Sequence, residues 1–142
     1  MSKLVLGLDM GTTSISAVAV DATGTVVSAV TKPHAAAVEN QPPEIAEQNA
    51  NQILTTAIAA LAEIADRCSG CGFAGLALTG QMHSTVLLDS ARGVVGNVIT
   101  WQDRRSLTET SSGTLLAELQ RRATDAAMLN TGCRLSAGYM GT

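Results

Sequence analysis

The stretch from Asp9 to Ser14, with the sequence DMGTTS, places an acid, a glycine and three hydroxyl residues between two apolar stretches. Gly11 allows a tight turn and a close approach of the backbone to a ligand. The hydroxyls and successive N–H groups of Thr12, Thr13 and Ser14 could form an anion-binding concavity, and the carboxylate of Asp9 is a ligand type that Mg²⁺ prefers. An ordinary hairpin turn explains the same residues, so their spacing alone leaves a turn and a phosphate site equally open.

A second polar segment, TGQMHS at 79–84, follows an apolar run that is expected to be a strand. Ligands of open α/β sheets gather at the carboxyl ends of the strands. Gln81 and His83 are able to hydrogen-bond sugar hydroxyls, and Met82 supplies a flexible apolar wall. The alternative for His83 is a loop histidine bonded to the backbone.

A third polar segment, TWQDRRS at 100–106, has the same placement after its own strand. Trp101 offers a flat apolar face and Asp103 an acceptor for hydroxyl groups. Arg104 and Arg105 are expected to form solvated ion pairs with nearby acids, and such pairs contribute little.

Apolar residues between these segments recur with the spacing of strands and helices. The pattern predicts strands at 3–8, 14–21, 26–31, 73–80, 84–89 and 96–101, helices at 50–67 and 114–122, and a short helical turn at 125–129. The first three strands are expected to form an antiparallel meander, which the buried strand 73–80 joins in parallel. The polar connection 32–49 holds all three prolines and is expected to be irregular, with His34 exposed. This order predicts an α/β fold of ribonuclease H-like type, with helices flanking a mixed sheet.

Composition limits the class of partner. Aromatic residues make up 2% of the chain and the net charge is −3, which argues against nucleic acid. No apolar run reaches the roughly 18 residues of a membrane span, and no signal-peptide pattern is recognised, so we expect a cytoplasmic protein without a membrane partner. Three cysteines make no disulfide framework, and the pair Cys68 and Cys71 is interpreted as part of a helix-to-strand turn. No role is assigned to them or to Cys133.

Four segments taken together resemble the N-terminal part of the FGGY carbohydrate kinases, a family of the actin, hexokinase and Hsp70-like ATPase superfamily. GLDMGTTSISAVAVD resembles the first phosphate motif, AEQN at 46–49 the segment before the first helix, and TGQMHS and ITWQDRRS the two sugar-site segments. Glycerol kinases carry an Arg-Glu pair where Met82 and His83 stand here. The Q-M-H form and the ending TGCRLSAGYMGT look more like sedoheptulokinases and xylulokinases.

The resemblance implies ATP-dependent phosphorylation of a ketose such as sedoheptulose or xylulose, with Mg²⁺ required. It implies that Asp9 helps to hold the metal and that the loop Gly11–Ser14 cradles the transferred phosphoryl group. The sugar-contacting positions that it implies are Met82, His83, Trp101 and Asp103. In some relatives a substrate-contacting side chain falls near position 138, which is Gly138 here.

The resemblance further implies that residues 1–142 form an incomplete N-terminal domain, and that the whole protein is a homodimer. The family's C-terminal domain supplies the catalytic base and the adenosine pocket, so this chain alone is expected to be inactive. One alternative is a non-catalytic sugar-binding or regulatory domain derived from such a kinase. Another is a nuclease of the same fold, which needs several converging carboxylates, whereas only Asp9 is well placed.

Overall fold

The computed structural model describes residues 3–126, 130 and 135–138, which divide into two compact units. The first unit comprises Met1–Ala36 and Ala50–Gln81, and the second comprises Ala37–Asn49 and Met82–Thr142. Each unit is therefore built from two separate pieces of the chain.

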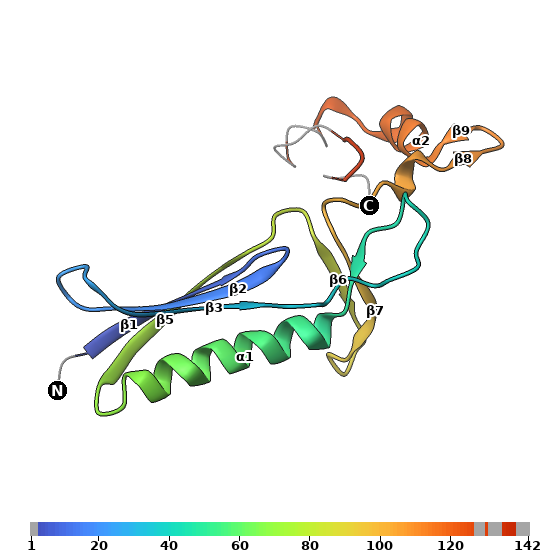
Figure 1. Cartoon of the computed structure of the whole chain (residues 1–142). Coiled ribbons are helices and arrows are strands. Elements are labelled where there is room, and N and C mark those ends of the chain that lie inside the picture. Colours follow the sequence, from blue (N-terminus) through green and yellow to red (C-terminus); the bar gives the residue numbers. More distant parts are fainter. Residues whose placement is uncertain (1–2, 127–129, 131–134, 139–142) are drawn as a thin grey trace. The chain divides into compact units, whose positions relative to one another are not determined.

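The first unit is a four-stranded sheet with one helix along it (Figure 1). Its elements are β1 (Lys3–Met10), β2 (Ser14–Val20), β3 (Val26–Pro33), α1 (Ala50–Arg67) and β5 (Gly72–Gly80). The strand order is β3-β2-β1-β5, with β1 and β3 antiparallel to β2 and with β5 parallel to β1. The predicted meander, the parallel fourth strand and the mixed sheet are confirmed.

Small aliphatic side chains form the core between this sheet and α1. Alternate residues of a strand point to one face, so Leu4 and Leu8 of β1 lie on the side that α1 covers. The other buried members come from β2, β3 and the helical segment: Ile15, Ala17, Ala19, Val30, Ala57, Ala60, Ile64 and Cys68. This core fixes the sheet whose strand ends carry the polar segments.

The expectation that residues 73–80 form a buried strand is wrong about burial. Helix α1 packs mainly on β2 and β3, and β5 lies at the sheet edge with β1 as its neighbour. Leu76 and Leu78 are exposed for that reason, although both pair with residues of β1. Among the described residues, no helix is long and apolar enough to cross a membrane.

The second unit contains short antiparallel strands and short helices. Its elements are β4 (Glu47–Gln48), β6 (Thr85–Leu88), β7 (Val94–Ile99), η1 (Arg105–Leu107), β8 (Glu109–Thr110), β9 (Gly113–Thr114) and α2 (Leu115–Arg122). One sheet has the order β4-β7-β6 and the other joins β8 to β9. The Thr114 hydroxyl begins α2 by accepting a hydrogen bond of 3.1 Å from the N–H of Ala117.

Two predictions about this region are corrected. The strands predicted at 84–89 and 96–101 exist, but they belong to a separate antiparallel sheet, so segment 100–106 does not follow a strand of the sheet that contains β5. The connection 32–49 was expected to be irregular, yet Glu47 and Gln48 form β4 by pairing with β7. The helical turn predicted at 125–129 lies partly outside the described residues.

The turn after α1 contains the cysteine pair. The N–H of Cys71 donates to the carbonyl of Cys68 at 3.0 Å, and both thiols are free. Cys68 is buried and Cys71 is exposed. This geometry fits the interpretation of the pair as part of a helix-to-strand turn; Cys133 lies outside the described residues.

Two isoleucines of α1 test whether the core beneath it stabilises the first unit. Ile64 has no exposed surface, so Ile64→Ala is expected to lower the free energy of unfolding by about 2–5 kcal/mol. Ile58 is 58% exposed, so Ile58→Ala is expected to change it by about 0.5 kcal/mol or less. Urea unfolding of both variants measures the difference, and equal losses would contradict this account of the core.

Candidate functional site

The loop between β1 and β2 is closed by its own backbone. The N–H of Gly11 donates to the carbonyl of Ser14 at 3.0 Å. A Cβ atom at position 11 would lie 3.0 Å from that same carbonyl oxygen, so a side chain there would crowd the turn. The segment is thus a tight hairpin connection, which is compatible with both interpretations of DMGTTS.

Gln81 lies at the same edge of the sheet as this loop. Asp9 pairs with Thr79 across the parallel strands, and the N–H of Gln81 donates to the carbonyl of Met10 at 3.1 Å. The carboxyl ends of β1 and β5 therefore meet, and they bring Asp9, the loop and Gln81 together. The predicted placement at a carboxyl edge is confirmed for these residues.

Asp9 places a carboxylate at this edge. The residue lies near the end of β1 and is exposed. The described residues contain no cluster of three or more His, Cys, Asp or Glu side chains that could hold a metal ion. Mg²⁺ commonly binds through one or two carboxylates together with substrate phosphates and water. The donor set therefore fits a Mg²⁺ ion that arrives with a nucleotide.

His34 is buried beside the loop, which corrects the expectation of an exposed residue. Only 9% of its surface is exposed. Its backbone N–H donates to the carbonyl of Thr13 at 3.1 Å, and its Nε2 lies 3.1 Å from the carbonyl oxygen of Gly11. The loop is thus anchored to the residue that follows β3.

Asp103 is the most deeply buried acid of the second unit. It has no exposed surface, and its oxygens accept four hydrogen bonds of 2.8–2.9 Å. One comes from the N–H of Ala46, and three come from the backbone and guanidinium of Arg105. Its predicted contact with a sugar hydroxyl stays a prediction, since these oxygens already have internal partners.

Arg105 links Asp103 to Glu47 of β4. The guanidinium reaches a Glu47 oxygen at 2.5 Å, and the other Glu47 oxygen accepts from Gln41 at 3.0 Å and Asn97 at 2.8 Å. The expectation of a solvated ion pair is wrong for Arg105, because its partner Asp103 is fully buried. We call Gln41, Glu47, Asn97, Asp103 and Arg105 the carboxylate network.

Hydrogen bonding sets the ionisation of this network. Burial opposes the charge of Asp103, but the bonds from Arg105 and Ala46 outweigh it, so the pKa of Asp103 lies below its ordinary value. Bonds from Arg105 and Asn97 lower the pKa of Glu47. The two carboxylates in turn raise the pKa of Arg105. All three groups are therefore charged at neutral pH.

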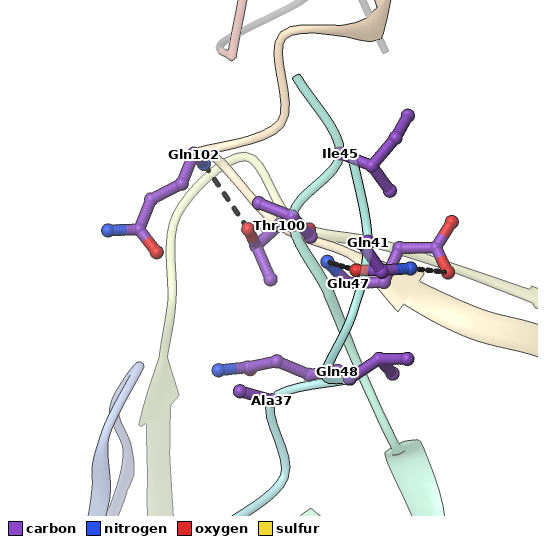
Figure 2. A pocket seen from close by; sticks show the side chains of 9 residues that line it. Ala37, Gln41, Ile45, Glu47, Gln48, Thr100 and Gln102 are labelled. Atoms are coloured by element: carbon purple, nitrogen blue, oxygen red, sulfur yellow. Dashed lines mark hydrogen bonds between the residues drawn. The ribbon is translucent and has the colours of Figure 1, made fainter. Parts of the chain in front are cut away.

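A polar pocket of about 210 Å³ lies next to the network (Figure 2). The N–H and hydroxyl of Thr100 both donate to the carbonyl of Ala46, at 3.0 and 2.9 Å, which ties the segment before α1 to the turn after β7. The lining residues are Ala37, Val38, Gln41, Ile45, Ala46, Glu47, Gln48, Thr100 and Gln102. The AEQN segment thus forms a wall of this pocket.

A second pocket, of about 360 Å³, contains the aromatic side chain. It is lined by Trp101, Gln102, Arg104, Ala137 and Gly138. Gly138 has a φ of +79°, and a Cβ atom there would lie 2.2 Å from the carbonyl oxygen of Trp101. Only glycine allows this approach, so a side chain at position 138 is incompatible with this arrangement. The volume is within the range of about 300–1,000 Å³ typical of small-molecule sites.

Met82 and His83 follow β5 and open the second unit. Met82 is 73% exposed, and His83 has a φ of +57°. Histidine tolerates this left-handed conformation better than most residues, yet it is uncommon outside glycine. Asn40 and Arg92 have similar φ values, so this conformation is compatible with a functional role of His83 but does not distinguish it from them.

Sequence reasoning missed His34 and the carboxylate network. The contacts of His34 join residues more than twenty positions apart, and those between Glu47 and Arg105 join residues 58 positions apart. No local pattern marks such pairs. The AEQN motif draws attention to Glu47, but it does not indicate that Arg105 is its partner.

Comparison with known proteins gives a consistent result. Residues 4–137 match the N-terminal domain of the FGGY family of carbohydrate kinases. The chain is similar to a xylulose kinase of Bacillus subtilis (strain 168), with 33% identity over 106 residues that cover 73% of this chain and 21% of that protein. It is also similar to a glycerol kinase of Oleidesulfovibrio alaskensis, with 31% identity over 146 residues that cover 100% of this chain and 28% of that protein.

Solved structures agree with this. A xylulose kinase from Rhodospirillum rubrum superposes with a TM-score of 0.76 at 31% identity, covering 89% of this chain and 25% of that one. The chain thus spans 21% to 28% of the length of the curated relatives named here. The match also supports the ribonuclease H-like fold of actin and hexokinase.

Replacing Asp103 tests the carboxylate network. Asp103→Asn leaves Arg105 without its buried charge partner and is expected to lower the free energy of unfolding by about 3 kcal/mol at neutral pH. Because the pKa of Asp103 is lowered on folding, its stabilisation is present above about pH 4 and lost as the pH falls through the lowered value. Urea unfolding between pH 2 and 7 is expected to show a smaller loss at acid pH in Asp103→Asn than in the unmodified protein.

The control for this experiment is Glu118→Gln. Glu118 pairs with Arg122 on α2, where the arginine side chain is 76% exposed, so the expected loss is about 0.5 kcal/mol or less. Equal effects of the two substitutions would show that burial adds nothing to the Asp103 pair.

Gly138→Ala tests the pocket around Trp101. The added methyl group would clash with the Trp101 carbonyl, so segment 137–138 must move away from it. Gly96→Ala is the matched control, because its φ of +76° is similar and a Cβ atom there meets nothing within 4 Å. Trp101 is the sole tryptophan. Its fluorescence is expected to shift in Gly138→Ala and not in Gly96→Ala, and unchanged spectra in both would contradict the close approach.

Proposed function

Because the chain belongs to the FGGY family of carbohydrate kinases, we propose that it is the N-terminal part of an ATP-dependent kinase acting on a hydroxyl of a ketose. The observation that carries the proposal is the meeting of Asp9, the loop Gly11–Ser14 and Gln81 at one sheet edge. An acid and a tight hydroxyl-rich turn in that position suit a nucleotide phosphate with its metal.

On the phosphate side, the residues of this chain bind and orient. Thr12, Thr13 and Ser14 would donate hydrogen bonds to the phosphoryl oxygens, and Asp9 would hold the metal ion. When bound, Mg²⁺ neutralises charge on the phosphates. Phosphoryl transfer depends mainly on positioning and on this neutralisation, so a loop held in one conformation favours the reaction.

For the sugar, Gln81 at the sheet edge of the first unit would bind hydroxyl groups. In the second unit His83 would bind hydroxyl groups, and Met82 and Trp101 would supply apolar contact. The flat face of Trp101 suits the C–H groups of a sugar. Asp103 follows Trp101 by two residues, and its hydrogen bonds to Ala46 and Arg105 fix the turn on which Trp101 lies. We propose that any effect of Asp103 on substrate affinity depends on that turn.

The substrate class rests on few residues. Both xylulose kinases and glycerol kinases are among the similar proteins, at comparable identity. The Q-M-H sequence at 81–83 favours a ketose such as xylulose or sedoheptulose over glycerol. Cytoplasmic location and homodimerisation of the whole protein stay predictions.

The general base is expected in the part of the relatives that this chain does not match. General-base catalysis increases the rate by about 10²–10⁴-fold, so we propose that this chain alone has no measurable turnover. The alternative function, a non-catalytic sugar-binding domain, would use the same pocket residues. Turnover by the product of the full reading frame distinguishes the two.

The test is ADP release with ATP, Mg²⁺ and a panel of xylulose, sedoheptulose, gluconate and glycerol. Within the active product, Asp9→Asn is expected to raise the Mg²⁺ concentration for half-maximal rate by about 10–100-fold, with the sugar KM unchanged. His83→Asn, which tolerates the same φ, is expected to raise the sugar KM with the Mg²⁺ requirement unchanged.

Asp66→Asn, on the exposed surface of α1, is the control for Asp9→Asn. Sugar binding without turnover on any member of the panel would favour the non-catalytic alternative. Equal Mg²⁺ dependence in Asp9→Asn and Asp66→Asn would remove Asp9 from the metal site.

A further inference from the structure

His34 makes two contacts with the loop between β1 and β2. It is the residue directly after β3, and its backbone N–H donates to the carbonyl of Thr13 at 3.1 Å. Its ring nitrogen Nε2 lies 3.1 Å from the carbonyl oxygen of Gly11. A carbonyl oxygen only accepts hydrogen bonds, so the ring donates from Nε2. Both ends of the segment Gly11–Thr13 are therefore bonded to one residue.

These contacts set the direction of the loop's peptide groups. A peptide bond is planar and trans, so its C=O and N–H point to opposite sides. The carbonyls of Gly11 and Thr13 point toward His34, and hence the N–H groups of Thr12 and Ser14, on the same two peptides, point away from it. Backbone N–H groups that point to one side of a loop can together bind an anion.

The second ring nitrogen, Nδ1, is also buried. It makes no hydrogen bond to any of the residues that the structure describes. Leaving a buried polar atom unpaired is unfavourable, and an aliphatic side chain in this position would avoid that cost. Among the described residues, the bond to Gly11 is the one polar contact of the ring, so the ring holds this carbonyl while its other nitrogen stays unpaired there.

We propose that His34 is the positioning residue of the phosphate loop, which keeps the N–H groups of Thr12 and Ser14 directed toward a nucleotide phosphate. The inference rests on the proposed kinase function of the loop. His34 does not touch the phosphate; it acts through the carbonyl of Gly11. Its loss should therefore weaken nucleotide binding and leave sugar binding intact.

The test compares His34→Leu with His34→Gln in the product of the full reading frame. Leucine fills much of the volume without a donor, whereas the glutamine amide places an N–H donor near the position of Nε2. His34→Leu is expected to raise the KM for ATP by about tenfold, because the free energy of one hydrogen bond corresponds to about a tenfold change in affinity. The sugar KM is expected to stay unchanged. His34→Gln is expected to restore the KM for ATP to within about threefold of the unmodified enzyme.

Ile64→Val is the control for general loss of stability, because it removes one buried methyl group from the core and does not touch the loop. An equal rise in the KM for ATP in Ile64→Val, or in His34→Gln, would overturn the inference. An active enzyme whose KM for ATP is unchanged in His34→Leu would overturn it too.

A second measurement does not depend on turnover. Amide hydrogen exchange of Gly11, whose N–H donates to the carbonyl of Ser14 within the loop, is expected to be faster in His34→Leu than in His34→Gln or the unmodified protein, and equal exchange in all three would overturn the inference. An unmodified enzyme with no turnover on any sugar would instead overturn the proposed function, while faster exchange in His34→Leu would still support the role of His34 in holding the loop.

Discussion

The ion pair between Asp103 and Arg105 is the interaction on which the second unit depends. Asp103 accepts bonds from both the backbone and the guanidinium of Arg105, and its remaining bond holds Ala46. A buried carboxylate without these donors would be strongly unfavourable. The turn containing Trp101 and the segment that ends at β4 are therefore fixed by one charged group. Both pockets have walls made from that turn.

The two units are stabilised by different forces. Every buried hydrophobic residue among those described belongs to the first unit, and the buried residues of the second are polar ones such as Gln48, Thr100 and Asp103. Apolar contact is non-directional, whereas hydrogen bonds and ion pairs have defined geometry. Apolar packing thus holds the sheet edge at which Asp9, the loop Gly11–Ser14 and Gln81 meet, and directional bonds hold the turn on which Trp101 lies.

The helices and strands could be predicted from the sequence. The burial of side chains and their long-range hydrogen-bond partners could not. The periodicity of Ala50–Arg67 gave the bounds of α1, and the two hairpins gave the meander. The exposure of β5 depends on which strands α1 covers, and the anchoring of the loop by His34 depends on the pairing of β2 with β3. The internal pairing of Arg105 with Glu47 joins residues 58 positions apart, which no local pattern in the sequence indicates. In the candidate site, the residues of the sheet edge were foreseen, while those that hold them in place were not.

The discontinuous course of the chain has a consequence for how the protein is assembled. The chain crosses between the units at 36–37, 49–50 and 81–82, so no single cut releases either unit as one continuous fragment. The bonds that join Ala46 and Glu47 to Asp103 and Arg105 close a long loop that contains α1 and β5. Closing a long loop has an entropic cost that a preformed helix and strand within it reduce. The second unit should therefore complete its folding after α1 and β5 have formed, and its ordering during synthesis must wait until Arg105 has left the ribosome.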